Sequence, residues 1–191
     1  MSIKRKPVWR EWLESIVIAF LLAMVIRTFI VQAFRIPTGS MRTTLIEGDI
    51  ILVNKFIYGA KVPFINFRLP ALREPKRGDV VVFIYPEDPK KDFIKRLVAV
   101  AGESVEIKNG TLYVNEQPLL EPVFNRTYYY NRGDFGREGR KIKVPQDSLF
   151  VLGDNSASSQ DSRYWGFVPS GNLLGKAMII YWPPNRIRII K

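Results

Sequence analysis

A long apolar run near the N-terminus constrains this chain more than any other feature. No side chain in residues 16–26 is polar, and Phe29-Ile30-Val31 resumes the run after a two-residue polar break. A helix over residues 12–34 is about 34 Å long at 1.5 Å per residue, which is enough to cross a hydrocarbon core of about 30 Å. Because the run has no polar face, it does not read as an amphipathic surface helix. We therefore predict a transmembrane anchor over residues 12–33.

Charged residues around the run predict its orientation. Four basic residues precede it, namely Lys4, Arg5, Lys6 and Arg10. Basic residues favour the cytoplasmic side, so residues 1–11 are expected to be a cytoplasmic tail and residues 34–191 an extracytoplasmic domain of a single-pass cell-membrane protein. Arg27 falls in the outer half of the span, where its long side chain can reach the head groups.

A cleavable signal sequence is the alternative to a retained anchor. Residues 16–26 have the length of the apolar part of such a sequence, and Val31-Gln32-Ala33 resembles a cleavage site. We favour the anchor because Arg27 lies between the run and that site, and because a cut there would leave Phe34 as the new N-terminus.

Two absent residue types narrow the chemistry. The chain has no histidine and no cysteine. This excludes histidine-containing triads, thiol nucleophiles, zinc sites built on imidazole or thiolate, and disulfides. A serine nucleophile would need lysine, a carboxylate or an amine as its base. The net charge of +11 favours an anionic partner, either a phospholipid surface or nucleic acid.

Beyond the apolar run, short strand-type segments alternate with turn signals, which predicts one mainly β domain. The expected strands cover residues 50–53, 80–84, 93–100, 105–108, 111–114, 142–144, 149–152 and 178–181. Asn109-Gly110 is a strong signal for a two-residue hairpin. The strand pattern fades between residues 116 and 139, so we predict an inserted flap or small subdomain over about residues 108–146. Its run Tyr128-Tyr129-Tyr130, beside arginines, also reads as a surface for stacking nucleic-acid bases.

Ser40 follows a proline and a glycine directly after the apolar run. Ile36 precedes Pro37 and is expected to be extended, and Gly39 permits a tight turn before the serine. On these residues alone, Ser40 reads best as the N-cap of a short helix. The other interpretation is a nucleophile presented at the end of a strand.

Lys95 is the strongest candidate for a base. Strand alternation places it on the same face as Phe93, Leu97 and Ala99, which is apolar. Burial lowers the pKa of a lysine and makes it a usable base near neutral pH. A strand lysine that reaches solvent at a sheet edge is the competing interpretation, and the sequence alone does not bring Lys95 near Ser40.

The N-terminal span and five motifs that follow it in order resemble the bacterial type I signal peptidases, or leader peptidases, a family of serine/lysine dyad enzymes. The motifs are Ile36-Pro37-Thr38-Gly39-Ser40-Met41, Gly48-Asp49-Ile50-Ile51-Leu52-Val53, Lys76-Arg77-Gly78-Asp79-Val80-Val81-Val82-Phe83, Phe93-Ile94-Lys95-Arg96, and Gly153-Asp154-Asn155 through Asp161-Ser162-Arg163-Tyr164-Trp165-Gly166. The resemblance implies a signal-peptidase-like β domain behind an N-terminal membrane helix. It also implies an endopeptidase that removes signal peptides from secreted preproteins after Ala-x-Ala sites. The implied partners are signal peptides and the phospholipid bilayer, without nucleic acid, metal or organic cofactor.

The resemblance also implies roles for individual residues. Ser40 matches the nucleophile and Lys95 the general base, while Thr38 and the Ser40 backbone N–H match the oxyanion hole. Ser159 matches a serine that hydrogen-bonds the lysine. Asp161 and Arg163 match a charged pair that braces the site. The implied substrate-binding residues are Phe34, Ile36, Pro37, Met41, Leu45, Ile51, Val82, Phe93 and Ile94, although plain core packing is an alternative for Ile51 and Val82.

The chain departs from the family pattern in three ways. Thr43 stands where the family has proline, which predicts a less rigid turn after Ser40. Ser156-Ala157-Ser158 replaces a more charged run, and there is one span where some relatives have two.

Two other functions remain open from the sequence. A self-cleaving repressor-type protease would share the dyad and much of the β fold, but it should carry a DNA-binding helix-turn-helix in place of a span. A membrane-anchored β module that binds an anionic polymer would explain the charge and the tyrosine run, but not the ordered motifs.

Overall fold

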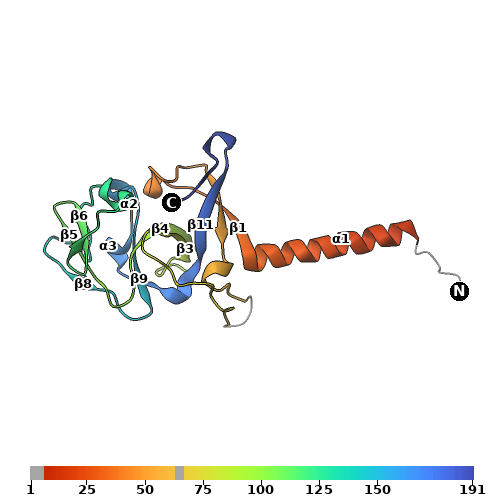
Figure 1. Cartoon of the computed structure of the whole chain (residues 1–191), viewed down its shortest axis with the longest axis horizontal. Coiled ribbons are helices and arrows are strands. Elements are labelled where there is room, and N and C mark those ends of the chain that lie inside the picture. Colours follow the sequence, from red (N-terminus) through yellow and green to blue (C-terminus); the bar gives the residue numbers. More distant parts are fainter. Residues whose placement is uncertain (1–6, 63–66) are drawn as a thin grey trace.

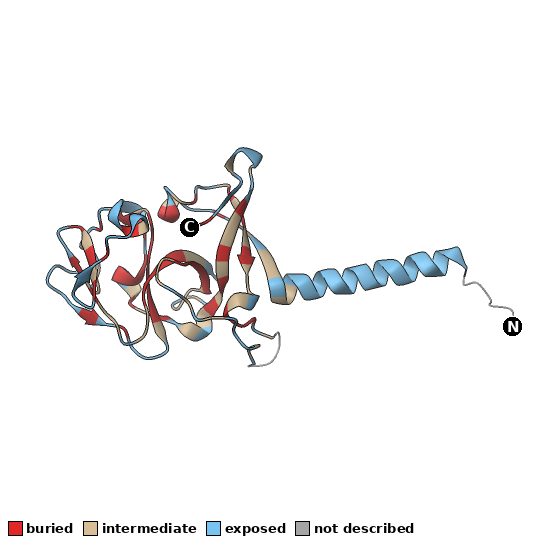
Figure 2. Cartoon of the chain, viewed as in Figure 1, coloured by how far each residue is buried: buried red, intermediate tan, exposed pale blue. Residues whose placement is uncertain are grey.

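The N-terminal apolar run forms a helix that stands clear of the rest of the chain (Figure 1). In the computed structural model, which describes residues 7–62 and 67–191, helix α1 spans Val8–Val25 and a π-helical turn, η1, spans Ile26–Ile30. All of α1 is exposed (Figure 2). Among the described residues, Val8–Ile30 is the one helix with the length and hydropathy to cross a membrane. Part of the predicted tail, including Lys4, Arg5 and Lys6, lies outside the described residues.

The helix ends earlier than the apolar pattern predicts. Residues 31–33, which we assigned to the anchor, belong to strand β1 (Val31–Arg35), which pairs antiparallel with β2 (Ile50–Asn54). The N–H of Lys55 donates to the carbonyl oxygen of Ile30 at 2.9 Å and so ties the last helical turn to the end of β2. Pairing with β2 satisfies the backbone of these residues in an extended conformation, which apolar composition alone does not reveal.

The main sheet places β1 at one end. Its strand order is β1-β2-β11-β3-β4-β9-β10, with β12 pairing β11, and all of these pairings are antiparallel. The remaining strands are β3 (Val80–Ile84), β4 (Asp92–Ala99), β9 (Ser148–Leu152), β10 (Val168–Pro169), β11 (Leu173–Trp182) and β12 (Arg188–Ile189). The fold is mainly β, as predicted.

A second, smaller sheet has the order β7-β6-β5-β8. Its strands are β5 (Ser104–Lys108), β6 (Thr111–Val114), β7 (Gln117–Pro118) and β8 (Ile142–Lys143), and helix α2 (Pro122–Asn125) follows β7. It overlaps the insertion predicted at residues 108–146. Asn109 and Gly110 both have positive φ, as the predicted two-residue hairpin requires. Tyr129 is buried, so the three consecutive tyrosines do not form one exposed face.

Short helical turns connect the strands. They are η2 (Gly39–Met41), η3 (Phe56–Tyr58), η4 (Ser156–Ser158), α3 (Ser162–Trp165), η5 (Ser170–Asn172) and η6 (Pro184–Arg186). Turn η2 follows β1 and packs on a buried cluster that includes Met41, Leu45 and Ile51. The end of β1 therefore presents this turn beside β4.

Candidate active site

Ser40 and Lys95 meet although they lie far apart in the sequence. Ser40 is the middle residue of η2, and its Oγ accepts a hydrogen bond from Lys95 Nζ at 2.7 Å. The N-cap of η2 is Thr38, without a side-chain capping bond, so the interpretation of Ser40 as an N-cap is wrong. A hydroxyl and an amine within hydrogen-bond reach have the geometry required of a nucleophile and its base.

The surroundings of Lys95 favour its neutral form. Its side chain is only 4% exposed, and Nζ lies 5.4 Å from the ring centroid of Phe93. Burial lowers the pKa of Lys95 to about 8, while the charges of Asp161 and Asp154 oppose the shift. At this pKa roughly one molecule in ten carries the neutral amine at pH 7. A solvated lysine, whose pKa is higher, would have a far smaller fraction of the neutral amine at the same pH.

Asn155 holds the turn that carries Ser40. Its backbone N–H donates to the carbonyl oxygen of Ser40 at 3.0 Å, and its Nδ2 donates to the carbonyl oxygen of Gly39 at 2.9 Å. Asn155 was named from the sequence only as part of the motif Gly153-Asp154-Asn155, without a role. Its place in a motif was the only available signal, since one of the two bonds is made by the backbone.

Gly153 allows the loop to approach the turn closely. A Cβ at this position would lie 2.5 Å from the Ser40 carbonyl oxygen and 2.2 Å from Ser159 Oγ, so no larger residue fits without a shift of the backbone. The Gly153 N–H donates to Asp161 Oδ2 at 3.1 Å, which fixes the loop from its other side.

Ser159 borders the site, but its hydroxyl does not bond the lysine. The hydroxyl donates to the carbonyl oxygen of Gln160 at 3.5 Å, and no hydrogen bond between these described residues joins Ser159 to Lys95. The Nζ of Lys95 donates instead to Ser40 Oγ and to the carbonyl oxygen of Ile94.

Asp161 and Arg163 form a fully buried ion pair behind the loop. The guanidinium donates to both carboxylate oxygens at 2.8 Å, and both side chains are 0% exposed. The remaining donors reach the Ser156 hydroxyl and the carbonyl oxygens of Tyr130, Ser156 and Ser159. The pair thus joins the loop to the inserted segment through one guanidinium whose donors all have partners.

A second buried ion pair lies on the opposite face of β4 from Lys95. Arg96 donates to both carboxylate oxygens of Asp154, at 2.8 and 2.7 Å, and the Thr44 hydroxyl donates to the same carboxylate at 2.5 Å. This ion pair was not predicted from the sequence. Strand alternation next to Lys95 was the signal that could have placed Arg96 on the other face.

The turn after Ser40 is anchored although it lacks the family's proline. Thr43 has φ +85°, a value that the proline ring, fixed near −65°, cannot adopt. Arg188 donates to the carbonyl oxygens of Thr43 and Thr44, at 3.4 and 2.7 Å. We predicted a less rigid turn in the absence of the proline. These bonds from Arg188 to the backbone restrain the turn in its place.

A small cavity beside the turn contains most of the predicted substrate-binding residues. It has a volume of about 40 Å³ and is lined by Phe34, Arg35, Ile36, Pro37, Ile51, Val82, Asp92, Phe93 and Ile94. Met41 and Leu45, which we also predicted here, do not line it. They are fully buried in the cluster beneath η2, because their side chains point into the core.

Comparison with known proteins identifies the family. The family model of signal peptidase, peptidase S26, matches residues 9–182. Signal peptidase I of Pseudomonas fluorescens is 34% identical over 220 residues, covering 97% of this chain and 78% of the relative. Probable signal peptidase I-2 of a Synechocystis species is 37% identical, covering 98% and 81%. Signal peptidase I T of Bacillus subtilis is 34% identical, covering 98% and 93%. The chain therefore belongs to the signal peptidase family, peptidase S26, and is a serine peptidase.

Proposed function

We propose that this chain is a membrane-anchored endopeptidase that cleaves signal peptides from secreted preproteins after Ala-x-Ala sites, with Ser40 as nucleophile and Lys95 as general base. Family membership supports the substrate class. The observation that carries the assignment of the dyad is the 2.7 Å hydrogen bond between Ser40 Oγ and the buried Lys95 Nζ.

In the proposed mechanism, neutral Lys95 takes the proton of Ser40 as its Oγ attacks the scissile carbonyl carbon. The Thr38 hydroxyl and the Ser40 N–H stabilise the developing oxyanion, and one such donor contributes about 3 to 4 kcal/mol. Lys95 then protonates the leaving amine. The acyl-enzyme is hydrolysed by a water molecule from which Lys95 takes a proton. Every step uses groups of this chain, the substrate and water.

The position of β1 supports binding of an extended peptide. β1 lies at the end of the strand order of the described sheet, and Phe34 of β1 and Ile36, which follows it, line the small cavity. An extended substrate can add to such an edge through backbone hydrogen bonds, while alternate side chains enter pockets. A cavity of about 40 Å³ suits a methyl group and excludes a ring.

We therefore expect the residue before the cleaved bond to decide processing. A preprotein with an Ala-x-Ala site, incubated with the full chain in nonionic detergent, should yield the mature protein and the free signal peptide. Changing the last alanine to phenylalanine should reduce kcat/KM at least about a hundredfold, because the ring meets closed packing. The same change two residues beyond the cleaved bond, in the mature region, is the matched control. Mass spectrometry of the products reads the cleaved bond, and equal processing of both variants would contradict the proposed pocket.

The pH profile provides a separate test of the base. Because the free amine of Lys95 is the active form, activity should rise as pH increases through about 8. Between pH 7 and 9 the neutral fraction rises from roughly a tenth to nine-tenths, so kcat/KM should increase about tenfold. The substrate should have no group that titrates in this range. A flat or falling profile would show that Lys95 is not the titrating base.

We further propose a single-pass topology in the cell membrane, with a cytoplasmic N-terminus and an extracytoplasmic catalytic domain. The apolar helix is exposed over its whole length, which is costly in water and favourable in a bilayer (Figure 2). The basic residues before it favour the cytoplasmic side.

A further inference from the structure

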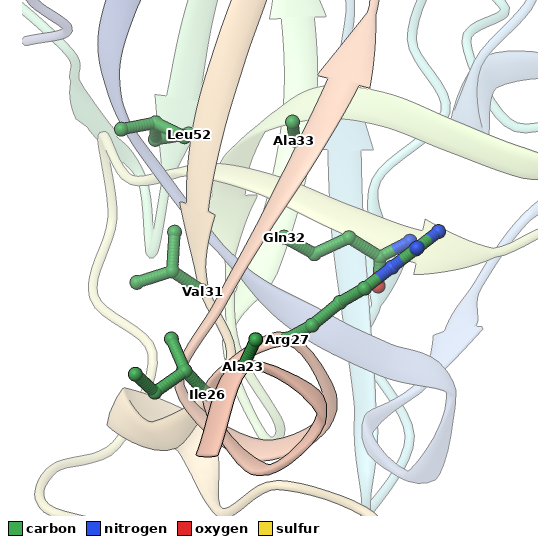
Figure 3. A pocket seen from close by; sticks show the side chains of 7 residues that line it. All are labelled: Ala23, Ile26, Arg27, Val31, Gln32, Ala33 and Leu52. Atoms are coloured by element: carbon green, nitrogen blue, oxygen red, sulfur yellow. The ribbon is translucent and has the colours of Figure 1, made fainter. Parts of the chain in front are cut away.

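A cavity lies where the apolar helix joins the main sheet (Figure 3). It has a volume of about 440 Å³. Its walls are Ala23 of α1, Ile26 and Arg27 of η1, residues 31–33 of β1, and Leu52 of β2. The π-helical turn runs into β1 without an intervening loop, so the cavity occupies the inside of a direct helix-to-strand connection.

The apolar wall of this cavity is separate from the proposed substrate site. Ala33 pairs with Leu52, and the next pair along the strands is Phe34 with Ile51. Adjacent residues of a strand point to opposite faces, so the Ala33–Leu52 wall faces away from the cleft lined by Phe34 and Ile51, whereas Gln32 lies on the same face of β1 as Phe34. The substrate cavity does not account for it.

The polar groups of the cavity are hydrogen-bond donors. Arg27 contributes a guanidinium, and Figure 3 shows its side chain extending in the same direction as that of Gln32. The Oε1 of Gln32 accepts a hydrogen bond from Lys55 Nζ at 3.3 Å, which leaves the amide N–H groups to donate. None of the seven described lining residues is acidic. Such a set matches the oxygens of an anion.

The position of Arg27 along the span indicates which kind of anion the cavity could bind. With Trp12, the first residue of the predicted anchor, at the inner boundary of the hydrocarbon core, Arg27 lies about 23 Å further along the helix, from where its long side chain can reach the outer phosphate groups. Ala23 and Ile26 line the cavity on the bilayer side of Arg27, and they suit the glycerol and the first methylenes of a lipid. A zwitterionic head group would place its own cation beside Arg27, whereas the apolar segment of a signal peptide would leave Arg27 without a counter-charge.

We propose that this cavity is a binding site for an anionic phospholipid of the outer leaflet, with its phosphate at Arg27 and its glycerol end against Ala23 and Ile26. This inference rests on the membrane anchor proposed above. A lipid seated inside the helix-to-strand connection fixes the angle between the span and the sheet, and therefore the direction in which the cleft faces the bilayer.

Native mass spectrometry of the full chain, released from micelles that contain equal amounts of phosphatidylglycerol and phosphatidylcholine, tests the proposal. The wild-type chain should retain phosphatidylglycerol preferentially. Arg27→Gln should reduce that preference roughly fivefold, the effect of one basic residue at an anionic membrane surface. Ala23→Phe leaves every charge in place but fills the cavity, and it should cause a similar loss.

Arg10→Gln is the matched control, because Arg10 is an exposed arginine at the other end of the same helix. It should leave the preference unchanged. An equal loss in Arg10→Gln, or no loss in Ala23→Phe, would mean diffuse attraction to basic residues and would overturn the site. Displacement of the bound lipid by excess signal peptide would identify the substrate as the occupant and would also overturn it.

Cleavage of a short soluble peptide in lipid-free detergent separates this proposal from the proposed function. Both Arg27→Gln and Ala23→Phe should retain wild-type peptide cleavage, which also shows that they fold. If the wild-type chain cleaves no such peptide, the proposed function fails while the lipid measurement still stands.

Discussion

Lys95→Ala is expected to lower kcat/KM for preprotein processing at least about a thousandfold, because it removes the base that lies 2.7 Å from Ser40 Oγ. Ser40→Ala should cause a comparable loss. The double variant should be no worse than either single variant, since the two groups act as one unit. Gel separation of precursor and mature protein over a wide range of enzyme concentrations measures the effect.

Two further substitutions separate a base from a positive charge. Lys95→Arg keeps the charge but replaces the amine with a guanidinium that stays protonated, so it should be as inactive as Lys95→Ala. Lys90→Ala changes an exposed lysine of the turn before β4 and should process normally. Substantial activity in Lys95→Arg would show that Lys95 acts through its charge and would remove it from the role of base.

The second large effect concerns stability. Arg163→Ala should lower the free energy of unfolding by about 3 to 5 kcal/mol, because it leaves the Asp161 carboxylate buried without its counter-charge. It also leaves the carbonyl oxygens of Tyr130 and Ser156 without their donor. Urea titration in detergent, followed by tryptophan fluorescence, measures the change.

Arg137→Ala is the matched control for this prediction. Arg137 pairs with Asp134, but both side chains are mostly exposed, at 69% and 65%. Exposed pairs contribute little, so this variant should unfold near the wild-type urea concentration. Similar midpoints for the two variants would show that the buried pair does not stabilise the fold.

The strands were predictable where short apolar or alternating runs lie between turn signals. The eight predicted strand segments are confirmed, and the Asn109-Gly110 hairpin forms as its turn chemistry requires. Strands β7, β10 and β12 have two residues each, too few for a pattern to emerge. The first three residues of β1 were assigned to the anchor, because their apolar residues continue those of the helix and only pairing with β2 makes them extended.

The types of residue in the candidate site were predictable from the sequence, but the contacts between them were less so. Alternation indicated a buried face for Lys95, and the structure buries this side chain. Its contact with Ser40 depends on how β4 packs against η2, which no local pattern encodes. Asn155 acts partly through its backbone N–H, and Arg96 acts through a partner far along the chain, so neither leaves a periodic signal.

Because the helix connects directly to β1, the length of this strand sets the distance between the membrane span and the nucleophile under the proposed topology. Five residues of β1 rise about 17 Å at about 3.3 Å per residue, and this rise separates the last helical turn from the segment that leads to Ser40. A substrate extended beside β1 must cover the same distance. A preprotein whose cleavable bond follows its apolar segment too closely would not reach the nucleophile, whatever side chains it offers to the pocket.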